Sequence, residues 1–220
     1  MSGRILKKIT ITVITAGMTL NVYAVDPGFY MGLMLGPATH NGGNITVQTD
    51  SSVPGIPPTT TATPKKNQFG SRFYLGYQVT KYAGFEGGLD YFTGISYTTE
   101  LPTCSSVQVR NRGFDFVGKG SLPFAGFTVF GKLGAALIYQ TTSGAINADS
   151  SLECGKSTYV TKVRPTASIG ASYDLTQNWV ADVTWNRLMV GGPVSSVDYF
   201  AFGISYHFVN KYCGQFLCDD

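Results

Sequence analysis

The sequence predicts an all-β protein, a transmembrane antiparallel β-barrel of eight strands with long loops on one side and short turns on the other. Three observations predict this fold. Apolar and polar residues alternate over many segments after residue 25, the connections between these segments alternate in length, and the chain begins with a segment typical of exported proteins.

The alternation is clearest in residues 68–80. Successive side chains of a β-strand point to opposite faces of its sheet, so a period of two residues indicates a strand. One face here is mostly apolar, and the other carries glycine, charge and polar groups, which is typical of a strand between lipid and a polar interior. The apolar face holds Phe69, Ser71, Phe73, Leu75, Tyr77 and Val79, and the polar face holds Gly70, Arg72, Tyr74, Gly76, Gln78 and Thr80.

The same pattern places the other strands in order. Strands are expected near residues 27–37, 68–80, 82–97, 108–121, 126–141, 160–174, 178–189 and 197–208. Tight connections are expected at 80–84, 122–125 and 175–178, and longer ones at 38–67, 98–107, 142–159 and 190–196. A hairpin needs only a few residues. This regular difference therefore favours an outer-membrane barrel with long extracellular loops and short periplasmic turns.

A soluble sandwich or a lipocalin-like barrel is the alternative, because it would also alternate. Its apolar residues would face inward, where residues 200, 202 and 204 (Phe, Phe, Ile) would have to fit. The lumen of an eight-stranded barrel has room only for its own side chains. The opposite face, with Ala201 and Gly203, suits that lumen better. Aromatic residues are expected at both membrane interfaces: Tyr97 and Tyr139 at the outer one, and Tyr82, Trp179, Tyr206 and Phe208 at the periplasmic one.

The N-terminus predicts export. Residues 1–24 combine a basic start, an uncharged apolar run and small residues before the site between Ala24 and Val25, which is the pattern of a cleaved signal peptide. A membrane anchor is the alternative, but the run is short for one. Cleavage removes three of the 16 basic residues and leaves 13 to balance the 13 acidic ones, so no basic surface points to nucleic acid. The predicted divisions are a signal peptide (1–24), the barrel domain (25–208) and a short periplasmic tail (209–220).

Four motifs resemble the small eight-stranded outer-membrane barrels typified by the OmpA transmembrane domain and OmpX. They are residues 28–32, 73–78, 87–91 and 200–208. The resemblance implies the outer membrane of a Gram-negative bacterium, with outer-membrane lipid and lipopolysaccharide as surroundings. The last motif resembles the aromatic-ended signal read by the barrel-assembly machinery, which here is Phe202, Ile204, Tyr206 and Phe208. Residues 209–220 depart from the pattern because they follow this signal, and the peptidoglycan-binding domain of full-length OmpA has no counterpart, so we expect no cell-wall tether.

Charged residues on the inward face predict a lumen charge network. Four of each sign follow the inward register: Arg72, Lys119, Lys132 and Arg164 against Glu86, Asp90, Asp115 and Asp182. An unpaired charge in so narrow an interior would be costly, so we expect these groups to pair. The network would then close the barrel, whereas a conducting path lined by the same charges is the alternative.

The four cysteines divide between the two sides of the membrane. Cys104 and Cys154 fall in predicted extracellular loops, and Cys213 and Cys218 fall in the predicted periplasmic tail. Because the membrane separates the two sets, we expect Cys104–Cys154 and Cys213–Cys218 disulfides in a compartment that permits them. Zinc binding by the tail pair with Asp219 and Asp220 is the alternative.

The first loop and the histidines bear on function. Residues 41–67 are rich in Thr, Pro, Gly and Ser, so we expect a mobile loop that either binds a host or environmental surface or is simply solvated. Lys65 and Lys66 are candidates there for lipopolysaccharide contact.

A serine hydrolase needs a histidine beside its nucleophile. His40 is expected in the loop and His207 at the periplasmic end of the lumen, far from outer-leaflet substrates. We therefore predict no enzyme, cofactor or metal site, and a structural or adhesin-like role, with a narrow channel for ions or small solutes as the alternative.

Overall fold

The structure is a computed structural model of the whole chain of 220 residues. It describes residues 28–42, 45–48, 59–64, 67–98, 106–124, 126–143, 157–191 and 194–208. No apolar helix of membrane-spanning length occurs in these ranges.

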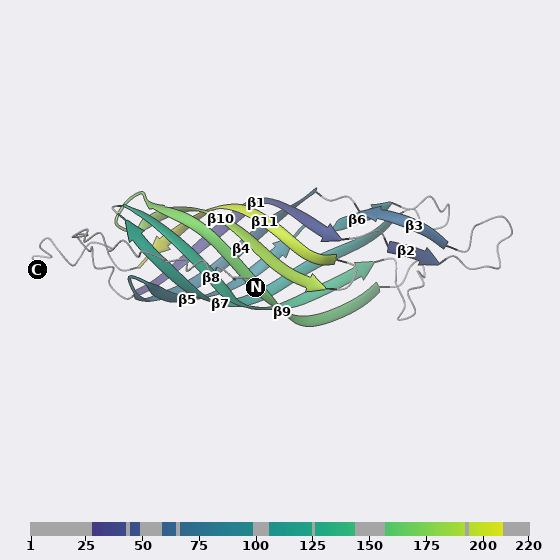
Figure 1. Cartoon of the computed structure of the whole chain (residues 1–220), viewed down its shortest axis with the longest axis horizontal. Helices are drawn as coiled ribbons and strands as arrows, with labels where there is room; N and C mark the ends of the chain where they lie inside the picture. Colours follow the sequence, from purple (N-terminus) through teal and green to yellow (C-terminus); the bar gives the residue numbers. More distant parts are fainter. Residues whose placement is uncertain are drawn as a thin grey trace, which may run out of the picture.

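The described residues form one closed antiparallel barrel of eight long strands (Figure 1). The strands are β1 (Gly28–Gly42), β4 (Asn67–Thr80), β5 (Ala83–Phe92) with its continuation β6 (Ile95–Thr98), β7 (Ser106–Phe124), β8 (Phe127–Ser143), β9 (Ser157–Asp174), β10 (Trp179–Gly191) and β11 (Val194–His207). Each strand pairs with its neighbour in the chain, and pairing of β1 with β11 closes the barrel. The predicted fold class is therefore confirmed, and most strands extend further toward the long-loop end than the alternation alone suggested.

Burial follows the alternation along the strands. On β4, Arg72 and Tyr74 are buried in the lumen, whereas Phe73 and Leu75 are exposed on the outside. Two tyrosines fit the lumen because each lies opposite a glycine across the β1–β4 pair, Tyr30 opposite Gly76 and Tyr74 opposite Gly32. A side chain at either glycine would overlap the facing ring. The outward apolar surface is what a strand needs to lie against lipid.

The short turns are built by two threonines and a glycine. The Thr80 hydroxyl oxygen accepts hydrogen bonds from the backbone N–H groups of Tyr82 and Ala83, at 3.2 and 3.1 Å. Thr176 does the same for the β9–β10 turn. Gly126 has a φ of 75°, which permits the reversal between β7 and β8. The predicted turn at residues 122–125 is therefore displaced, because β7 continues through Pro123 to Phe124, at the strand end where a missing N–H is tolerated.

A break at residues 93–94 changes the face of the third strand. Even-numbered residues face the lumen in β5, but odd-numbered residues do so in β6. Because a shift of one residue exchanges the two faces of a strand, Tyr97 is buried in the lumen with 1% of its surface exposed. Its expected place in the outer aromatic girdle is wrong, whereas Tyr139 faces outward as expected.

All four expected long connections contain more strand than predicted, and two of them differ most from the prediction. In the first, β1 runs to Gly42, and β2 (Ile45–Gln48) pairs with β3 (Thr59–Pro64), which pairs in turn with β6. We call β2 and β3 the β2–β3 arm; Figure 1 shows it at the end of the barrel opposite the short turns. The expected loop at 190–196 is wrong, because Val190 and Val194 are buried in the lumen and Gly191, with a φ of 73°, ends β10 three residues before β11 begins.

Candidate functional site in the barrel lumen

Six charged side chains meet in the lumen, and Glu86 lies at their centre. We call this group the ionic layer: Arg72, Glu86, Asp90, Asp115, Lys119 and Lys132. The Glu86 carboxylate lies 2.9 Å from Arg72 Nη1, 2.7 Å from Lys132 Nζ and 3.7 Å from Lys119 Nζ. It also accepts a hydrogen bond of 3.0 Å from the Tyr30 hydroxyl. Glu86 is 1% exposed, so these four groups replace the water that a carboxylate otherwise needs.

Arg72 connects Glu86 to two further carboxylates. Its Nε and Nη2 atoms donate to the two oxygens of Asp115, at 2.8 and 2.7 Å, which is the bidentate geometry of a strong ion pair. Its Nε atom lies 3.9 Å from Asp90. The strand register places these groups at one height, because Arg72 lies opposite Asp90 across β4 and β5. One guanidinium therefore holds together side chains from β4, β5 and β7.

Aromatic rings separate the cations of this layer. Lys132 Nζ lies 5.1 Å from the centre of the Tyr74 ring, and Lys119 Nζ lies 5.0 Å from that of Tyr30. Both ammonium groups also lie 4.9 Å from the centre of the Phe130 ring. Such cation–π contacts favour charge in a poorly hydrated place. Charged groups and aromatic rings thus share this level of the lumen.

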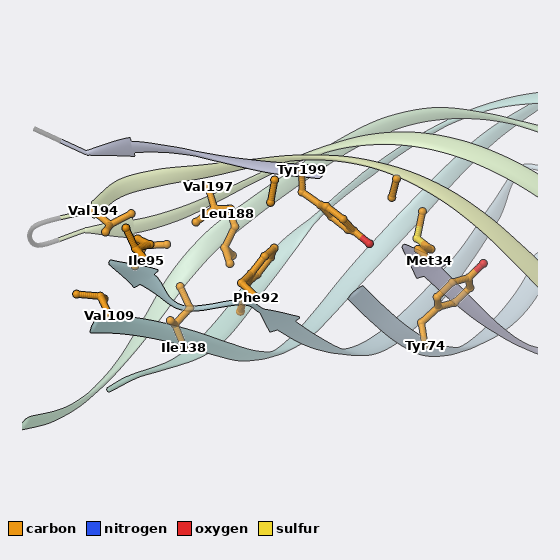
Figure 2. Packing of buried hydrophobic residues seen from close by; sticks show 14 of the residues in the cluster. Met34, Tyr74, Phe92, Ile95, Val109, Ile138, Leu188, Val194, Val197 and Tyr199 are labelled. Carbon is orange, nitrogen blue, oxygen red and sulfur yellow. The ribbon is translucent and has the colours of Figure 1, made fainter. Parts of the chain in front are cut away.

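An apolar layer lies above the ionic layer, toward the long-loop end. Figure 2 shows most of its side chains. Its members are buried and come from five strands: Phe92, Ile95, Val109, Ile138, Leu188, Val190, Val194, Val197 and Tyr199. Phe92 and Tyr199 touch edge to face, with ring centres 5.8 Å apart. We did not expect this layer from the sequence. The sequence does hold a pattern that predicts it: the inward positions near the long-loop ends of β7, β8 and β10 are occupied by Val109, Ile138 and Leu188.

Two small cavities flank the charged side chains. The one nearer the short turns offers about 40 Å³ to water-sized molecules and is lined in part by Lys119, Lys132 and Asp182. The other offers about 20 Å³, between Arg72 and Asp115 below and Leu188 and Tyr199 above. Each has room for one or a few water molecules, since a buried water needs roughly 10–15 Å³.

Residues 24–211 match the family described as the OmpA-like transmembrane domain. The chain belongs to this family. An uncharacterized protein of Coxiella burnetii is 28% identical over 185 residues, which cover 67% of this chain and 71% of that protein. Outer membrane protein A of Serratia marcescens is 27% identical over 155 residues, which cover 65% of this chain and 40% of that protein. The chain thus matches only about two fifths of the length of this OmpA relative.

Solved structures of small outer-membrane barrels share the fold. Neisserial surface protein A superposes with a TM-score of 0.53 at 14% identity, covering 83% of this chain and 99% of that one. The outer membrane protein OprG of Pseudomonas aeruginosa superposes with a TM-score of 0.52 at 15% identity, covering 82% and 96%. Together with the OmpA relatives, family membership places this OmpA-like barrel in the outer membrane of a Gram-negative bacterium, surrounded by outer-membrane lipid.

The eight predicted lumen charges of this OmpA-like barrel fall into three groups. Six form the ionic layer. Asp182 lies apart from its cations and accepts hydrogen bonds from the hydroxyls of Tyr74, at 3.3 Å, and Thr184, at 3.1 Å. Arg164 lies outside the network, near the long-loop end, where its Nε donates to the backbone carbonyl of Val190 at 3.1 Å. Alternation predicts which face of the sheet a residue occupies but not its height along the barrel axis. The sequence pattern therefore does not separate Arg164 from the residues of the ionic layer.

Both histidines lie in the lumen. The expected loop position of His40 is wrong, because β1 extends past it; its ring is 1% exposed and hydrogen-bonded to Gln68. His207 lies at the short-turn end and stacks on Tyr30, with ring centres 4.8 Å apart. The two histidines are thus at opposite ends of the barrel.

The other predicted sites divide between described and undescribed residues. Phe202, Ile204 and Phe208 of the expected assembly signal are exposed on the outside, next to the half-exposed Tyr206. The predicted signal peptide with Ala24 and Val25, the predicted tail (209–220), and Lys65 and Lys66 lie outside the described residues. So do Cys104, Cys154, Cys213 and Cys218. Both disulfides therefore stay predictions.

Proposed function

We propose that this protein is a non-enzymatic outer-membrane barrel that is closed to ions and acts through its extracellular end, as a structural and surface-recognition protein. The filled lumen is the observation that carries this proposal. An ion that entered from the short-turn end would first meet the paired charges around Arg72 and Glu86 and then the buried apolar layer. Dry apolar constrictions oppose ion passage because an ion loses its hydration there.

The extracellular end offers the larger surface for contact with a partner. The β2–β3 arm continues the barrel sheet beyond β6, with Thr63 opposite Thr98 and Pro64 opposite Tyr97. Within the described residues, β2 pairs only with β3, so its other edge has backbone groups available to a partner strand. Loops and edges carried by a rigid barrel are suited to recognition. A host or environmental surface is the partner class that we propose.

A narrow channel is the second candidate, and the two cavities are the observation that favours it. They lie on either side of Arg72 and its partners, so a rearrangement of that side chain would shorten the dry path between them. Planar-bilayer conductance of the refolded protein separates the two candidates. We expect silence or rare small openings, because both layers block the lumen. Steady, ion-selective openings would contradict the closed barrel and favour the channel.

Removal of the β2–β3 arm tests the recognition role. Thr39 lies opposite Asn67 in the β1–β4 ladder, so a short Gly-Ser turn can replace residues 43–66 without loss of a barrel strand. We expect this variant to fold and to lose most of the attachment that the unaltered protein confers on a non-adherent Gram-negative strain. Cultured epithelial cells and immobilised matrix proteins are the test surfaces.

A matched control shortens a different loop. Ser143 lies opposite Ser157 at the ends of β8 and β9, so residues 144–156 can be replaced by the same turn. Attachment should persist in this control if the arm is the binding element. Equal attachment by the arm-deleted and unaltered proteins, with both folded as judged by gel mobility with and without boiling, would exclude the arm.

A further inference from the structure

Two arginines face outward near the long-loop ends of the barrel strands. Arg110 and Arg112 lie on the exposed face of β7, two residues apart. Residues of one strand face that are two positions apart lie about 7 Å from each other. Below them the same face of β7 is apolar or glycine: Phe114, Phe116, Gly118, Gly120, Leu122 and Phe124. The change from this apolar face to two guanidinium groups occurs in a single step of the alternation.

The height of this step coincides with the membrane boundary. The segment of β7 from Phe114 to Phe124 advances ten residues toward the short turn. At about 3.3 Å per residue and a tilt of roughly 40°, this segment spans about 25 Å along the membrane normal, which is the height of the apolar band of an outer-membrane barrel. Arg112 then lies about 5 Å and Arg110 about 10 Å beyond the apolar band. Because the short turns face the periplasm, this is the level of the outer-leaflet headgroups.

Tyrosines of neighbouring strands surround the arginines. Arg112 lies between Tyr91 and Tyr139 in the sheet, and its guanidinium carbon is 5.4 Å from the centre of the Tyr91 ring. Arg110 lies opposite Thr141, which lies opposite Tyr159 of β9. All three tyrosines are outward-facing, from 45% exposed for Tyr91 to 77% for Tyr159. We call these five residues the arginine–tyrosine patch: Tyr91, Arg110, Arg112, Tyr139 and Tyr159.

Neither arginine forms an ion pair with a described residue. Arg110 donates to the neutral Gln108 side chain at 3.3 Å, and Arg112 contacts the Tyr91 ring. The described carboxylates of β5 and β7 all face the lumen, and β8 has none. Arg187, another outward-facing arginine, differs because it makes a bidentate ion pair with Asp198, at 2.7 and 2.8 Å. The patch therefore presents two positive charges that no described carboxylate neutralises.

We propose that the arginine–tyrosine patch binds the phosphorylated headgroup of an outer-leaflet glycolipid, lipid A. Guanidinium groups bind phosphate through paired N–H donors, and exposed tyrosines lie readily at the headgroup level, where they can pack against sugar rings. Two arginines about 7 Å apart, directly above the lipid-facing band, can hold one phosphate between them while the acyl chains contact Phe114 and Phe116. This site holds one lipid molecule against β5, β7, β8 and β9. It does not depend on the partner that the extracellular loops bind.

Lipid retention by the purified full chain tests this site. The protein is refolded in detergent and mixed with bis-phosphorylated lipid A, with dephosphorylated lipid A, or with phosphatidylglycerol, and retained lipid is counted by native mass spectrometry. We expect preferential retention of the phosphorylated lipid A, which decreases as salt rises because the patch is exposed. Arg110→Ala/Arg112→Ala should weaken this retention about thirtyfold, the loss expected for two basic residues at an anionic surface.

Arg187→Ala is the matched control, because it removes an outward-facing arginine that already has a carboxylate partner. We expect it to retain lipid A like the unaltered protein. Equal retention of phosphorylated and dephosphorylated lipid A by the unaltered protein would overturn the proposal, and this comparison needs no variant to fold. Equal retention of phosphatidylglycerol, or an unchanged affinity in the double variant, would overturn it as well.

Discussion

Glu86→Gln should lower the free energy of unfolding by about 3–5 kcal/mol, the usual cost of removing one partner from a buried ion pair. The substitution keeps the shape of the side chain and removes its charge. The cations of Arg72, Lys119 and Lys132 would then face one another around a neutral amide, at a residue that has only 1% of its surface exposed. The Tyr30 hydroxyl would also lose its charged acceptor. Urea unfolding in lipid vesicles, followed by tryptophan fluorescence, measures the loss.

Two further substitutions give the expected order of effects. Lys132→Met should cost less than Glu86→Gln, because Glu86 keeps Arg72 at 2.9 Å and Lys119 at 3.7 Å. Asp198→Asn breaks the outward pair with Arg187, whose side chain is 43% exposed, and should cost less than about 1 kcal/mol. If Glu86→Gln were no more destabilising than Asp198→Asn, the ionic layer would contribute little to stability.

The sequence predicted the face of most lumen residues because the two-residue period of a strand is a local property. Arg72, Glu86 and Lys132 could be assigned to the lumen from their neighbours in the chain alone. The prediction for Tyr97 was wrong because the break at residues 93–94 exchanges the faces of the strand. Gly94 is the kind of residue that can mark a bulge, but glycines occur throughout the strands, so Gly94 alone does not locate the break. A strand interruption depends on pairing with β4 and β7, which a single sequence does not display.

Heights and strand ends were harder to predict than faces. Arg164 has the correct face, but its height in the lumen depends on the stagger between β9 and β10, which brings it to the carbonyl of Val190. Residues 37–42 combine proline, polar residues and glycine and resemble a loop locally. They form strand because β11 supplies partners as far as Gly42, and β4 supplies partners on the other side as far as Thr39, which lies opposite both Asn67 and Asp198. Tertiary pairing thus overrode local preference in that segment.

The lumen should conduct only when both of its layers are opened, because the ionic layer and the apolar layer follow one another along the path and either one alone blocks ions. Arg72→Ala/Asp115→Ala removes a bidentate pair and keeps the charge balanced. Phe92→Ala/Tyr199→Ala removes two rings in contact from the apolar layer. Each double variant alone should be as silent as the unaltered protein. The variant with all four substitutions should conduct at least about tenfold more than either, because a hydrated path then replaces both constrictions.

The control for the four-substitution variant removes aromatic rings from the outside of the barrel. Phe200 and Phe202 contact each other edge to face on the lipid-facing surface of β11, so Phe200→Ala/Phe202→Ala alters no lumen residue and should leave the barrel silent. Gel mobility with and without boiling establishes that each variant is folded before its conductance is measured. Conductance in the Arg72→Ala/Asp115→Ala variant alone would show that the apolar layer is no barrier. The ionic layer would then be the only seal, and a movement of Arg72 could open the barrel.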